Sequence, residues 1–519
     1  MKSNQKIYSI NAIVIMIDIF TKLLVATKLK ENDLISIIPN FFSIYYVKNT
    51  GAAFSILQDS TIFLVILSAL IIVVLDRFIK KEKNMPRLQE LSFGLVMGGI
   101  FGNMIDRIIN HSVTDFISFR IFNYNFPVFN IADIGITVGA CLLVISILME
   151  EKKYLEINKI KGDLMDKFIK YYKKEKEILT NKINKFNNNL VIEDNKFIKD
   201  NLLLFKNLNS DGKLIRGTLV NLGYSLLKEK ENYSNDLALA YEVFQTAILV
   251  HDDIIDNDQK RRGKDTIHYA NYNKYKNYST DTLEVKSLGN SIAICMGDYG
   301  LSFASKIIVD SYKDDTNLSN VLSYFIDTIL KTIKGEVLDV ILPFNSKHSL
   351  ITNKELEENI LSIYKLKTAY YTIIGPISTG MILAGTTNEQ LKDIEQFGKL
   401  VGIAFQIQDD ILGIYSEETG KVKASDIKEF KQTILYSYAI KTEYKDELLK
   451  YYGTSDLQEE SIKKVQEILK KCGALDYSKN KMNEMYDESL NILSNFSWIK
   501  EDKKELLKGF VEYLRVRNK

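Results

Sequence analysis

The chain has 519 residues, more than one ordinary hydrophobic core holds, so two or more domains are expected. Its 68 Lys and Arg balance 66 Asp and Glu, which excludes the basic excess typical of nucleic-acid binding. The three cysteines (Cys141, Cys295 and Cys472) lie far apart without a C-x-x-C pair, so neither a disulfide framework nor a zinc site is predicted. Only 5 prolines occur, which favours long helices.

Four apolar segments near the N-terminus are long enough to cross a bilayer, at about residues 8–26, 60–78, 90–109 and 132–149. No small-residue cleavage site follows the first, so we expect a retained span rather than a signal peptide. Basic residues precede the first segment, follow the second and follow the fourth. With four spans these groups all lie on the cytoplasmic side, together with everything after residue 150.

Charged residues interrupt two of these segments: Asp18, Lys22, Asp106 and Arg107. Charges at membrane depth are costly and usually functional. The alternative is that they lie near span ends, where long side chains reach the interface cheaply. Glycines between Gly98 and Arg107 would also let helices approach closely in lipid, so a four-span anchor held by buried polar contacts is a second interpretation.

Two further aspartates flank the start of the fourth segment. Asp115 precedes it and Asp133 begins it, so both are expected near the outer membrane surface. If they meet, the two carboxyl groups share one proton. The ionised member can then activate a water while the protonated member polarises a scissile carbonyl. Asn103 and Asn130 are candidates to orient the carboxylates or to bind the substrate backbone.

The motifs of this half, taken in order, are MIDIFTK (Met16–Lys22), NTGAAF (Asn49–Phe54), GNMIDR (Gly102–Arg107), VTDF (Val113–Phe116) and FNIAD (Phe129–Asp133). This set resembles lipoprotein signal peptidase over about residues 7–150. The resemblance implies cleavage of diacylglyceryl-modified prolipoproteins, a catalytic dyad and no cofactor. The dyad would be Asp115 and Asp133. The supporting residues would be Asp18, Asn49, Asn103, Asp106, Arg107 and Asn130.

Two details accompany this resemblance. The segment between the first two spans, about residues 33–58, resembles the family's small extracytoplasmic β-cradle. Ile134 stands where the family commonly has a small Ser, and we expect the change to be tolerated.

The remainder of the chain has helical periodicity throughout. Residues 154–200 are charged and amphipathic without a Gly/Ser-rich or Pro-rich linker, so a helix is expected to lead directly into the second domain. A loop is expected at about 269–287. The predicted fold is mainly all-α: a four-helix transmembrane domain with a small β-cradle (residues 1–152), then a soluble all-α helical bundle (residues 153–519).

An acidic cluster, HDDIID from His251 to Asp256, is the centre of the second domain. On a helix, Asp252 and Asp256 face the same way, with Asp253 adjacent. Mg²⁺ binds few protein carboxylates and fills its octahedron with water and phosphate oxygens, so a DDxxD cluster indicates a metal-bridged diphosphate site. Acidic triplets also occur on solvated helix faces, which is the alternative. Nearby arginines suit phosphate binding.

HDDIIDNDQKRRG, FQIQDDILG and SDIKEFKQT together resemble the trans-isoprenyl diphosphate synthases over about residues 160–519. The resemblance implies an isoprenoid synthase fold, a homodimer, Mg²⁺, and condensation of isopentenyl diphosphate with an allylic diphosphate. The metal-binding residues would be Asp252, Asp253, Asp256, Asp409 and Asp410. The diphosphate-binding residues would be Lys213, Arg216, Arg261, Arg262, Lys367, Thr368, Gln406, Lys421 and Lys431.

Three positions depart from that family's pattern. Gly413 stands where the second motif usually has its last Asp, Glu336 replaces a frequent Gln, and Gln245 stands where many members have His. Product length should depend on side chains below the first motif. Ala247 and Ile248 would not block a growing chain, whereas Tyr241 and Phe244 are deeper and could form a floor, which favours about C20 or longer.

Three interpretations follow from the motifs. The preferred one is a bifunctional enzyme in a bacterial cell membrane, multi-pass, with a cytoplasmic C-terminal domain. The second is an active peptidase whose prenyltransferase-like domain is catalytically silent and serves dimerisation or regulation. The third, an interaction protein with neither activity, would need eroded motifs in both halves.

Overall fold

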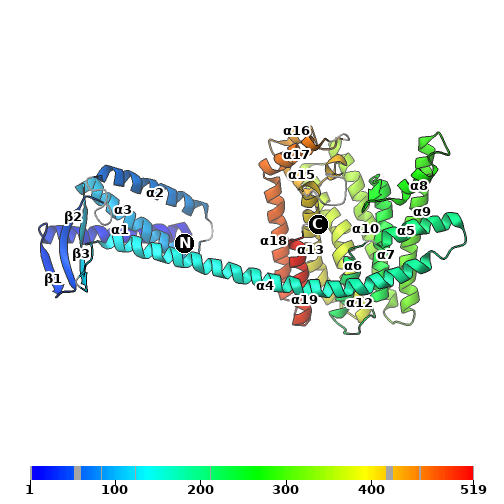
Figure 1. Cartoon of the computed structure of the whole chain (residues 1–519), viewed down its shortest axis with the longest axis horizontal. Helices are drawn as coiled ribbons and strands as arrows, with labels where there is room; N and C mark the ends of the chain where they lie inside the picture. Colours follow the sequence, from blue (N-terminus) through cyan, green and yellow to red (C-terminus); the bar gives the residue numbers. More distant parts are fainter. Residues whose placement is uncertain are drawn as a thin grey trace. The chain divides into compact units, whose positions relative to one another are not determined.

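The computed structural model describes residues 3–51, 60–82, 85–122, 124–210, 212–415, 425–454 and 458–517. The chain divides into two compact units, Met1–Lys159 and Ile160–Lys519. Both units consist mainly of helices and the sheets are small, which confirms the predicted mainly all-α class (Figure 1). Helix α4 (Ile131–Leu190) contributes its first part to one unit and its last part to the other.

The first unit combines apolar helices with a small antiparallel sheet (Figure 1). Its elements are α1 (Ser3–Lys28), β1 (Leu34–Ile38), β2 (Phe42–Asn49), α2 (Thr61–Lys81), α3 (Arg87–Asn110), β3 (Val113–Ile121), β4 (Tyr124–Asn125) and the start of α4. The strand order is β1-β2-β3-β4. In the β2–β3 register Val47 pairs with Asp115 and Asn49 pairs with Val113, so the sheet brings Asn49 close to Asp115.

Helix α3 packs against α1 and α2 and approaches the start of α4 closely. A Cβ added at Gly99 would lie 2.3 Å from the carbonyl oxygen of Ala132, and one at Gly98 would lie 2.6 Å from Cβ of Val14. Small residues at such contacts let helix backbones come together without a hydrophobic driving force. The glycines of this motif are therefore needed for packing, and they bring the polar residues of α3 next to α1 and α4.

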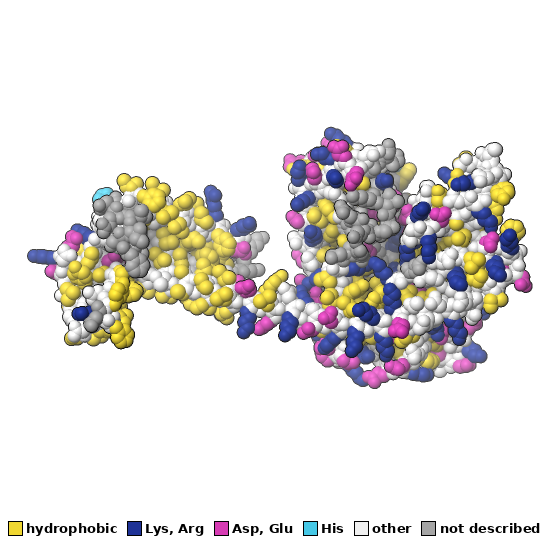
Figure 2. Space-filling view, viewed as in Figure 1, with side chains coloured by type: hydrophobic (Ala, Val, Ile, Leu, Met, Phe, Trp, Pro, Cys, Tyr) yellow, Lys and Arg dark blue, Asp and Glu magenta, His cyan; other side chains and the backbone are white. Residues whose placement is uncertain are grey.

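The outward faces of these helices are apolar. Figure 2 shows hydrophobic side chains over much of the visible face of the first unit's helices. Exposed members include Ile13, Met16, Ile17 and Phe20 on α1, Ile62, Phe63 and Ile66 on α2, and Val144, Ile147 and Leu148 on α4. Soluble proteins rarely expose so large a contiguous apolar surface, so this unit is membrane-associated.

Within the described residues, length and composition make α1, α2, α4 and α9 (Thr282–Tyr312) apolar enough to cross a membrane. Helix α3 was predicted as a span but does not reach that composition. It carries several glycines together with Asn103, Asp106 and Arg107. Helix α9 belongs to the second unit, where it packs against α7 and α8.

The second unit is a bundle of helices with one short hairpin. Its elements begin with the end of α4 and continue through α5 (Lys196–Asn209), α6 (Ile215–Ser225), α7 (Asn235–Ile255), β5 (Lys260–Arg261), β6 (Lys264–Asp265), α8 (Ile267–Tyr275), α9, α10 (Leu318–Lys347), α11 (Asn353–Ile363), η2 (Tyr364–Ile374), α12 (Gly375–Ala384), α13 (Asn388–Tyr415), α14 (Ser425–Lys428), α15 (Ile434–Ala439), α16 (Lys445–Leu448), α17 (Glu459–Lys471), α18 (Ala474–Ser494) and α19 (Glu501–Arg515).

Two large clusters of buried apolar side chains fill this bundle, and a third, smaller one lies on η2. Of the two large clusters, one lies around α7, α9 and α10, and the other around α6, α13 and the C-terminal helices. Between α11 and α12 the chain forms a π-helix, η2, in which the turns are wider than in an α-helix. The π-helix packs against α10 and α13, so its side chains face the middle of the bundle.

Candidate active sites

The first site forms where the sheet of the first unit meets the start of α4. Asn130 precedes the helix, and its Oδ1 accepts the backbone N–H of Asp133 at 3.0 Å. Asp133 Oδ2 in turn accepts the backbone N–H of Asn130 at 3.2 Å. This reciprocal pair is a capping box with Asp in the third helical position. The N-I-A-D sequence therefore both begins α4 and fixes the Asp133 carboxylate.

Two asparagine amides connect the aspartates. Asn130 Nδ2 donates to Asp115 Oδ1 at 2.7 Å, and Asn103 Nδ2 donates to Asp133 Oδ1 at 2.8 Å. Asn130 Nδ2 also lies 3.0 Å from Asn103 Oδ1, and Asn49 Nδ2 donates to Asp115 Oδ2 at 3.0 Å. Asp115 is 3% exposed. Burial, and after it the charge of Asp133, raises the pKa of Asp115 to about 7, so this carboxyl group retains a proton near neutral pH.

The remaining predicted residues hold the backbone around this pair. Asp18 Oδ1 accepts the N–H of Ala132 at 2.9 Å, and Asp106 Oδ2 accepts the N–H of Thr114 at 2.6 Å. Arg107 Nη2 donates to the carbonyl of Gly51 at 2.9 Å. All eight residues predicted for the peptidase half therefore belong to one neighbourhood. Sequence reasoning did not include Lys22 among them, although its position inside an apolar segment was a signal.

The second site begins at the C-terminal end of α7. Asp252 Oδ1 lies 3.3 Å from Lys367 Nζ, and Asp252 Oδ2 lies 3.3 Å from Arg261 Nη2. Arg261 Nε donates to Asp253, whose carboxyl group is buried. Burial outweighs this arginine and raises the pKa of Asp253 to about 7. Arg261, predicted to bind diphosphate, thus contacts the first acidic motif.

Two partly buried lysines link this motif to other elements. Lys367 Nζ lies 2.8 Å from Glu336 Oε2 and 2.7 Å from Asp339 Oδ2, both on α10. Lys431 Nζ lies 3.9 Å from Asp256 Oδ2 and 3.7 Å from Asp426 Oδ1. Although burial disfavours their charged forms, the surrounding carboxylates raise the pKa of both lysines. Asp339 and Asp426 are site residues that the sequence prediction missed, although Asp426 lies in a motif that it quoted.

The second acidic motif lies on α13. Asp410 accepts hydrogen bonds from the hydroxyl of Tyr364 and, at 2.8 Å, from Gln406 Nε2. Thr368 Oγ1 donates to Gln406 Oε1 at 2.5 Å. Tyr364 and Thr368 both belong to η2, so the π-helix orders this motif. Asp409 is paired with Arg517 near the C-terminus, a partner that the sequence did not predict.

Gly413 has a neighbour that explains its small size. A Cβ at this position would lie 2.6 Å from Asp426 Oδ2. A carboxylate from α14 therefore occupies the space beside the position where the family's motif commonly carries its last Asp.

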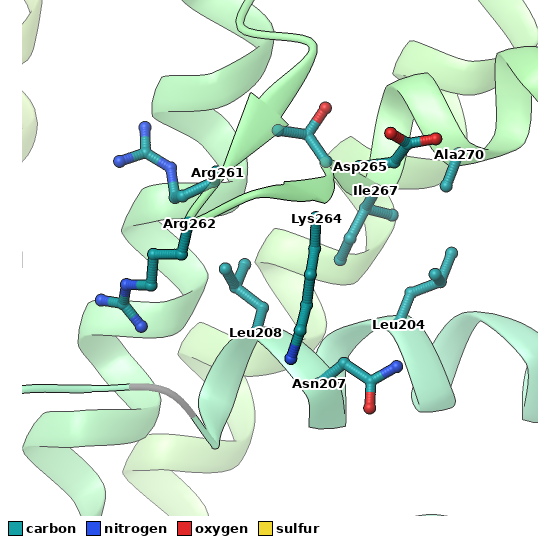
Figure 3. Close-up of a pocket in the computed structure, with 10 residues that line it drawn as sticks. Leu204, Asn207, Leu208, Arg261, Arg262, Lys264, Asp265, Ile267 and Ala270 are labelled. Atoms are coloured by element: carbon teal, nitrogen blue, oxygen red, sulfur yellow. The ribbon is translucent and has the colours of Figure 1, made fainter. Parts of the chain in front are cut away.

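The predicted basic residues lie on several elements. Arg216 Nη2 donates to Thr372 Oγ1 at 2.8 Å, and its guanidinium lies 3.9 Å from the centre of the Tyr371 ring. Burial, and next the charge of Arg517, lowers the pKa of Lys213. Arg262 lines a cavity of about 300 Å³ between α5, the β5–β6 hairpin and α8. Figure 3 shows the hairpin residues Arg261 and Arg262 at one side of this cavity. Lys421 lies outside the described residues.

The residues predicted to control product length are in the core below the first motif. Tyr241 and Phe244 are completely buried and contact the ring of Phe325 edge to face, with centroid separations of 5.1 and 5.5 Å. Phe244 also contacts the ring of Tyr371 at 5.2 Å. Ala247 is buried without a bulky side chain and Ile248 is partly buried. The two aromatic residues of α7 thus lie two to three helical turns before the acidic motif and contact rings from α10 and η2.

The donors of the second site have the chemistry that magnesium prefers. The carboxylates of Asp252, Asp256, Asp409 and Asp426 are hard oxygen ligands, and octahedral Mg²⁺ needs only one or two of them beside water and phosphate. In the described part of the chain, no three Asp, Glu, His or Cys side chains converge closely enough to form a metal-binding group. Lysine and arginine side chains lie between the carboxylates instead.

Comparison with known proteins gives a separate match for each of the two units. Residues 10–149 match the family model described as signal peptidase (SPase) II, and residues 201–469 match that of polyprenyl synthetase. A lipoprotein signal peptidase of Symbiobacterium thermophilum is 43% identical over 141 residues, which is 27% of this chain and 93% of that protein. A short chain isoprenyl diphosphate synthase of Methanocaldococcus jannaschii is 29% identical over 279 residues, which is 52% of this chain and 76% of that protein.

Solved structures share the fold of the second unit. A geranylgeranyl pyrophosphate synthase of Corynebacterium glutamicum, complexed with isoprenyl diphosphate and magnesium, has a TM-score of 0.56 at 23% identity and covers 69% of this chain and 99% of its own. A polyprenyl synthase of Caulobacter crescentus, complexed with calcium and isoprenyl diphosphate, has a TM-score of 0.54 at 22% identity, with coverage of 68% and 98%. The chain therefore belongs to two families, signal peptidase II through its N-terminal unit and polyprenyl synthetase through its C-terminal unit.

Proposed function

We propose that the protein is a bifunctional enzyme. The first unit cleaves the signal peptide of diacylglyceryl-modified prolipoproteins, and the second condenses isopentenyl diphosphate with an allylic diphosphate. The observation that supports the first activity is the pair Asp115 and Asp133. The side-chain amides of Asn103 and Asn130 connect the two carboxyl groups by hydrogen bonds, beside an apolar helical surface. The second rests on two acidic motifs that each have basic neighbours: Lys367 and Lys431 beside the first, and Arg517 and Lys213 beside the second.

In the peptidase reaction Asp115 is the protonated member of the pair, since its pKa is about 7. It donates a hydrogen bond to the scissile carbonyl. Asp133, which accepts N–H donors from Asn103 and Asn130, takes a proton from the attacking water. Asn49 and Arg107 hold the segment at Gly51 next to the dyad, where they can bind the backbone of an extended substrate.

In the prenyl transfer reaction, Mg²⁺ would be held by Asp252 and Asp253 at the end of α7, Asp256 directly after it, and Asp409 and Asp410 on α13. Bound magnesium would neutralise the diphosphate leaving group of the allylic substrate. Lysine and arginine side chains bind the diphosphates of both substrates. This role is proposed for Lys213, Arg216, Arg262, Lys367, Lys421 and Lys431, with Thr368 and Gln406 as neutral donors. Arg261 would also bind diphosphate once its ion pairs with Asp252 and Asp253 are broken.

The buried walls of the second unit protect the allylic cation from water. We propose that Tyr241 and Phe244, which contact the ring of Phe325, form the floor that stops the growing chain, and that Ala247 and Ile248 are too small to block it. This arrangement supports a product of about C20 or longer, as floors deeper than the first helical turn admit longer chains.

The proposed setting is a bacterial cell membrane that the first unit spans several times, with the second unit cytoplasmic, residues 1–152 as the peptidase domain and 153–519 as the synthase. We also propose a homodimer of the second unit. Exposed apolar side chains recur at helical spacing along α10 and support a second copy as the partner: Ile326, Leu330, Ile333, Val337, Val340, Ile341 and Phe344.

Both activities are tested with the full-length protein in detergent. Labelled isopentenyl diphosphate, farnesyl diphosphate and Mg²⁺ should give a longer prenyl diphosphate, and Asp252→Ala should abolish it. A diacylated prolipoprotein should be cleaved, and Asp133→Asn should abolish that cleavage without affecting prenyl transfer. Protein that cleaves the prolipoprotein but elongates no allylic primer would mean that the second unit is catalytically silent.

A further inference from the structure

A buried lysine, Lys22, lies behind the two catalytic aspartates, near the C-terminal end of α1. Lys22 is 5% exposed, and its Nζ lies 2.8 Å from Asp18 Oδ2 and 3.7 Å from Asp106 Oδ2. It also donates to Asn103 Oδ1 at 2.8 Å. One ammonium group therefore contacts two carboxylates and one amide. None of these partners is a residue proposed to react with substrate.

Each carboxylate anchors the backbone directly before one catalytic aspartate. Asp18 accepts the N–H of Ala132, the residue before Asp133. Asp106 accepts the N–H of Thr114, the residue before Asp115. Since Lys22 contacts both anchors, it joins the start of α4 to the start of β3. The Lys22 ammonium group thus contacts both carboxylates, Asp18 and Asp106, that hold the backbone next to the catalytic residues.

Lys22 also determines the direction of the Asn103 amide. Because an ammonium group only donates hydrogen bonds, the amide atom facing it must be oxygen. Asn103 Nδ2 is then directed to Asp133 Oδ1, at 2.8 Å. The same oxygen accepts from Asn130 Nδ2, which also donates to Asp115. If the Asn103 amide were reversed, its NH₂ group would face Lys22 and Asn130 Nδ2, both of which are donors.

We propose that Lys22 is a positioning residue for prolipoprotein cleavage. It sets the separation of the two catalytic carboxylates and fixes the orientation of the Asn103 amide. The inference deepens the proposed function and rests on the assignment of Asp115 and Asp133 as the dyad. The competing explanation is that Lys22 only neutralises buried negative charge. In that role it would stabilise the fold without positioning the two catalytic carboxyl groups.

A double variant separates these explanations. Lys22→Met leaves the carboxylates without their cation, so it risks misfolding. Adding Asp18→Asn removes one negative charge while keeping an oxygen that can accept the N–H of Ala132. Lys28→Met, an exposed lysine on the same helix, is the matched control. The full-length proteins are compared for thermal midpoint and for kcat and KM with a diacylated prolipoprotein.

For the Lys22→Met/Asp18→Asn protein we expect a KM and a thermal midpoint close to the wild-type values, with kcat about 100-fold lower, the loss that a misplacement of about 1 Å produces. A kcat within twofold of wild type would overturn the inference and leave charge balance as the role of Lys22. A parallel loss of substrate binding and thermal midpoint would also overturn it, since Lys22 would then support the fold. Asp115→Asn tests the dyad separately: if this variant still cleaves, the proposed function itself fails.

Discussion

Replacing Asn130 by serine should slow prolipoprotein cleavage without unfolding the first unit. Asn130 has two roles, since its Oδ1 caps α4 at the N–H of Asp133 and its Nδ2 donates to Asp115 at 2.7 Å. Serine also caps helices well, but it has no amide to reach Asp115. Because Asp115 is protonated, this is a hydrogen bond between neutral groups. Such a bond contributes about 0.5–1.5 kcal/mol, which corresponds to a loss of about 2- to 13-fold in kcat/KM.

The assay compares Asn130→Ser and Asn130→Ala in detergent, with kcat/KM for cleavage and the thermal midpoint measured on each. Alanine loses the cap as well, so its protein should unfold more easily by about 1 kcal/mol. Asn195→Ala is the matched control, because Asn195 caps α5 with the same type of contact, to Phe197 and Ile198, far from the dyad in sequence. Full activity of Asn130→Ser beside a slow Asn130→Ala would refute the reasoning, since Asn130 would then act only as a cap.

Three further predictions concern both units. Peptidase kcat/KM should fall about tenfold per pH unit above pH about 7, where Asp115 loses its proton, and a profile flat to about pH 9 would contradict that role. Phe244→Ala should lengthen the prenyl product by at least one isoprene unit in chromatography of the dephosphorylated products, because it opens the aromatic floor; an unchanged product would exclude this floor. Gly413→Ala should reduce prenyl transfer about tenfold because its methyl group overlaps Asp426, whereas Gly162→Ala, which meets nothing within 4 Å, should not; equal activities would show that Asp426 moves aside freely.

Local features of both sites could be predicted from the sequence because spacing alone determines them. The N-I-A-D sequence places a carboxylate in the first turn of α4, and D-D-x-x-D places Asp252 and Asp256 on one side of α7. The apolar segments likewise predicted the helices of the first unit. Each of these features depends only on the spacing of residues that are close together in the sequence.

The partners of these residues could not be predicted in the same way. Lys22 contacts Asn103 across 81 positions, and Arg517 contacts Asp409 across 108. Gly413 looked like the loss of a carboxylate, yet Asp426 lies against it from α14. Such contacts depend on how distant helices pack, and no local pattern encodes them.

The π-helix η2 has a consequence for how the synthase tolerates changes in length. A π-turn holds more residues than an α-turn, so η2 resembles an α-helix into which extra residues have been inserted. Removing one residue between Tyr364 and Ile374 would let this stretch relax to ordinary α-helical winding. Each residue advances an α-helix by about 100°, so the lysine and threonine at its centre would rotate away from the acidic motifs. The synthase should therefore tolerate insertions and deletions poorly in η2, whereas loops accept them easily.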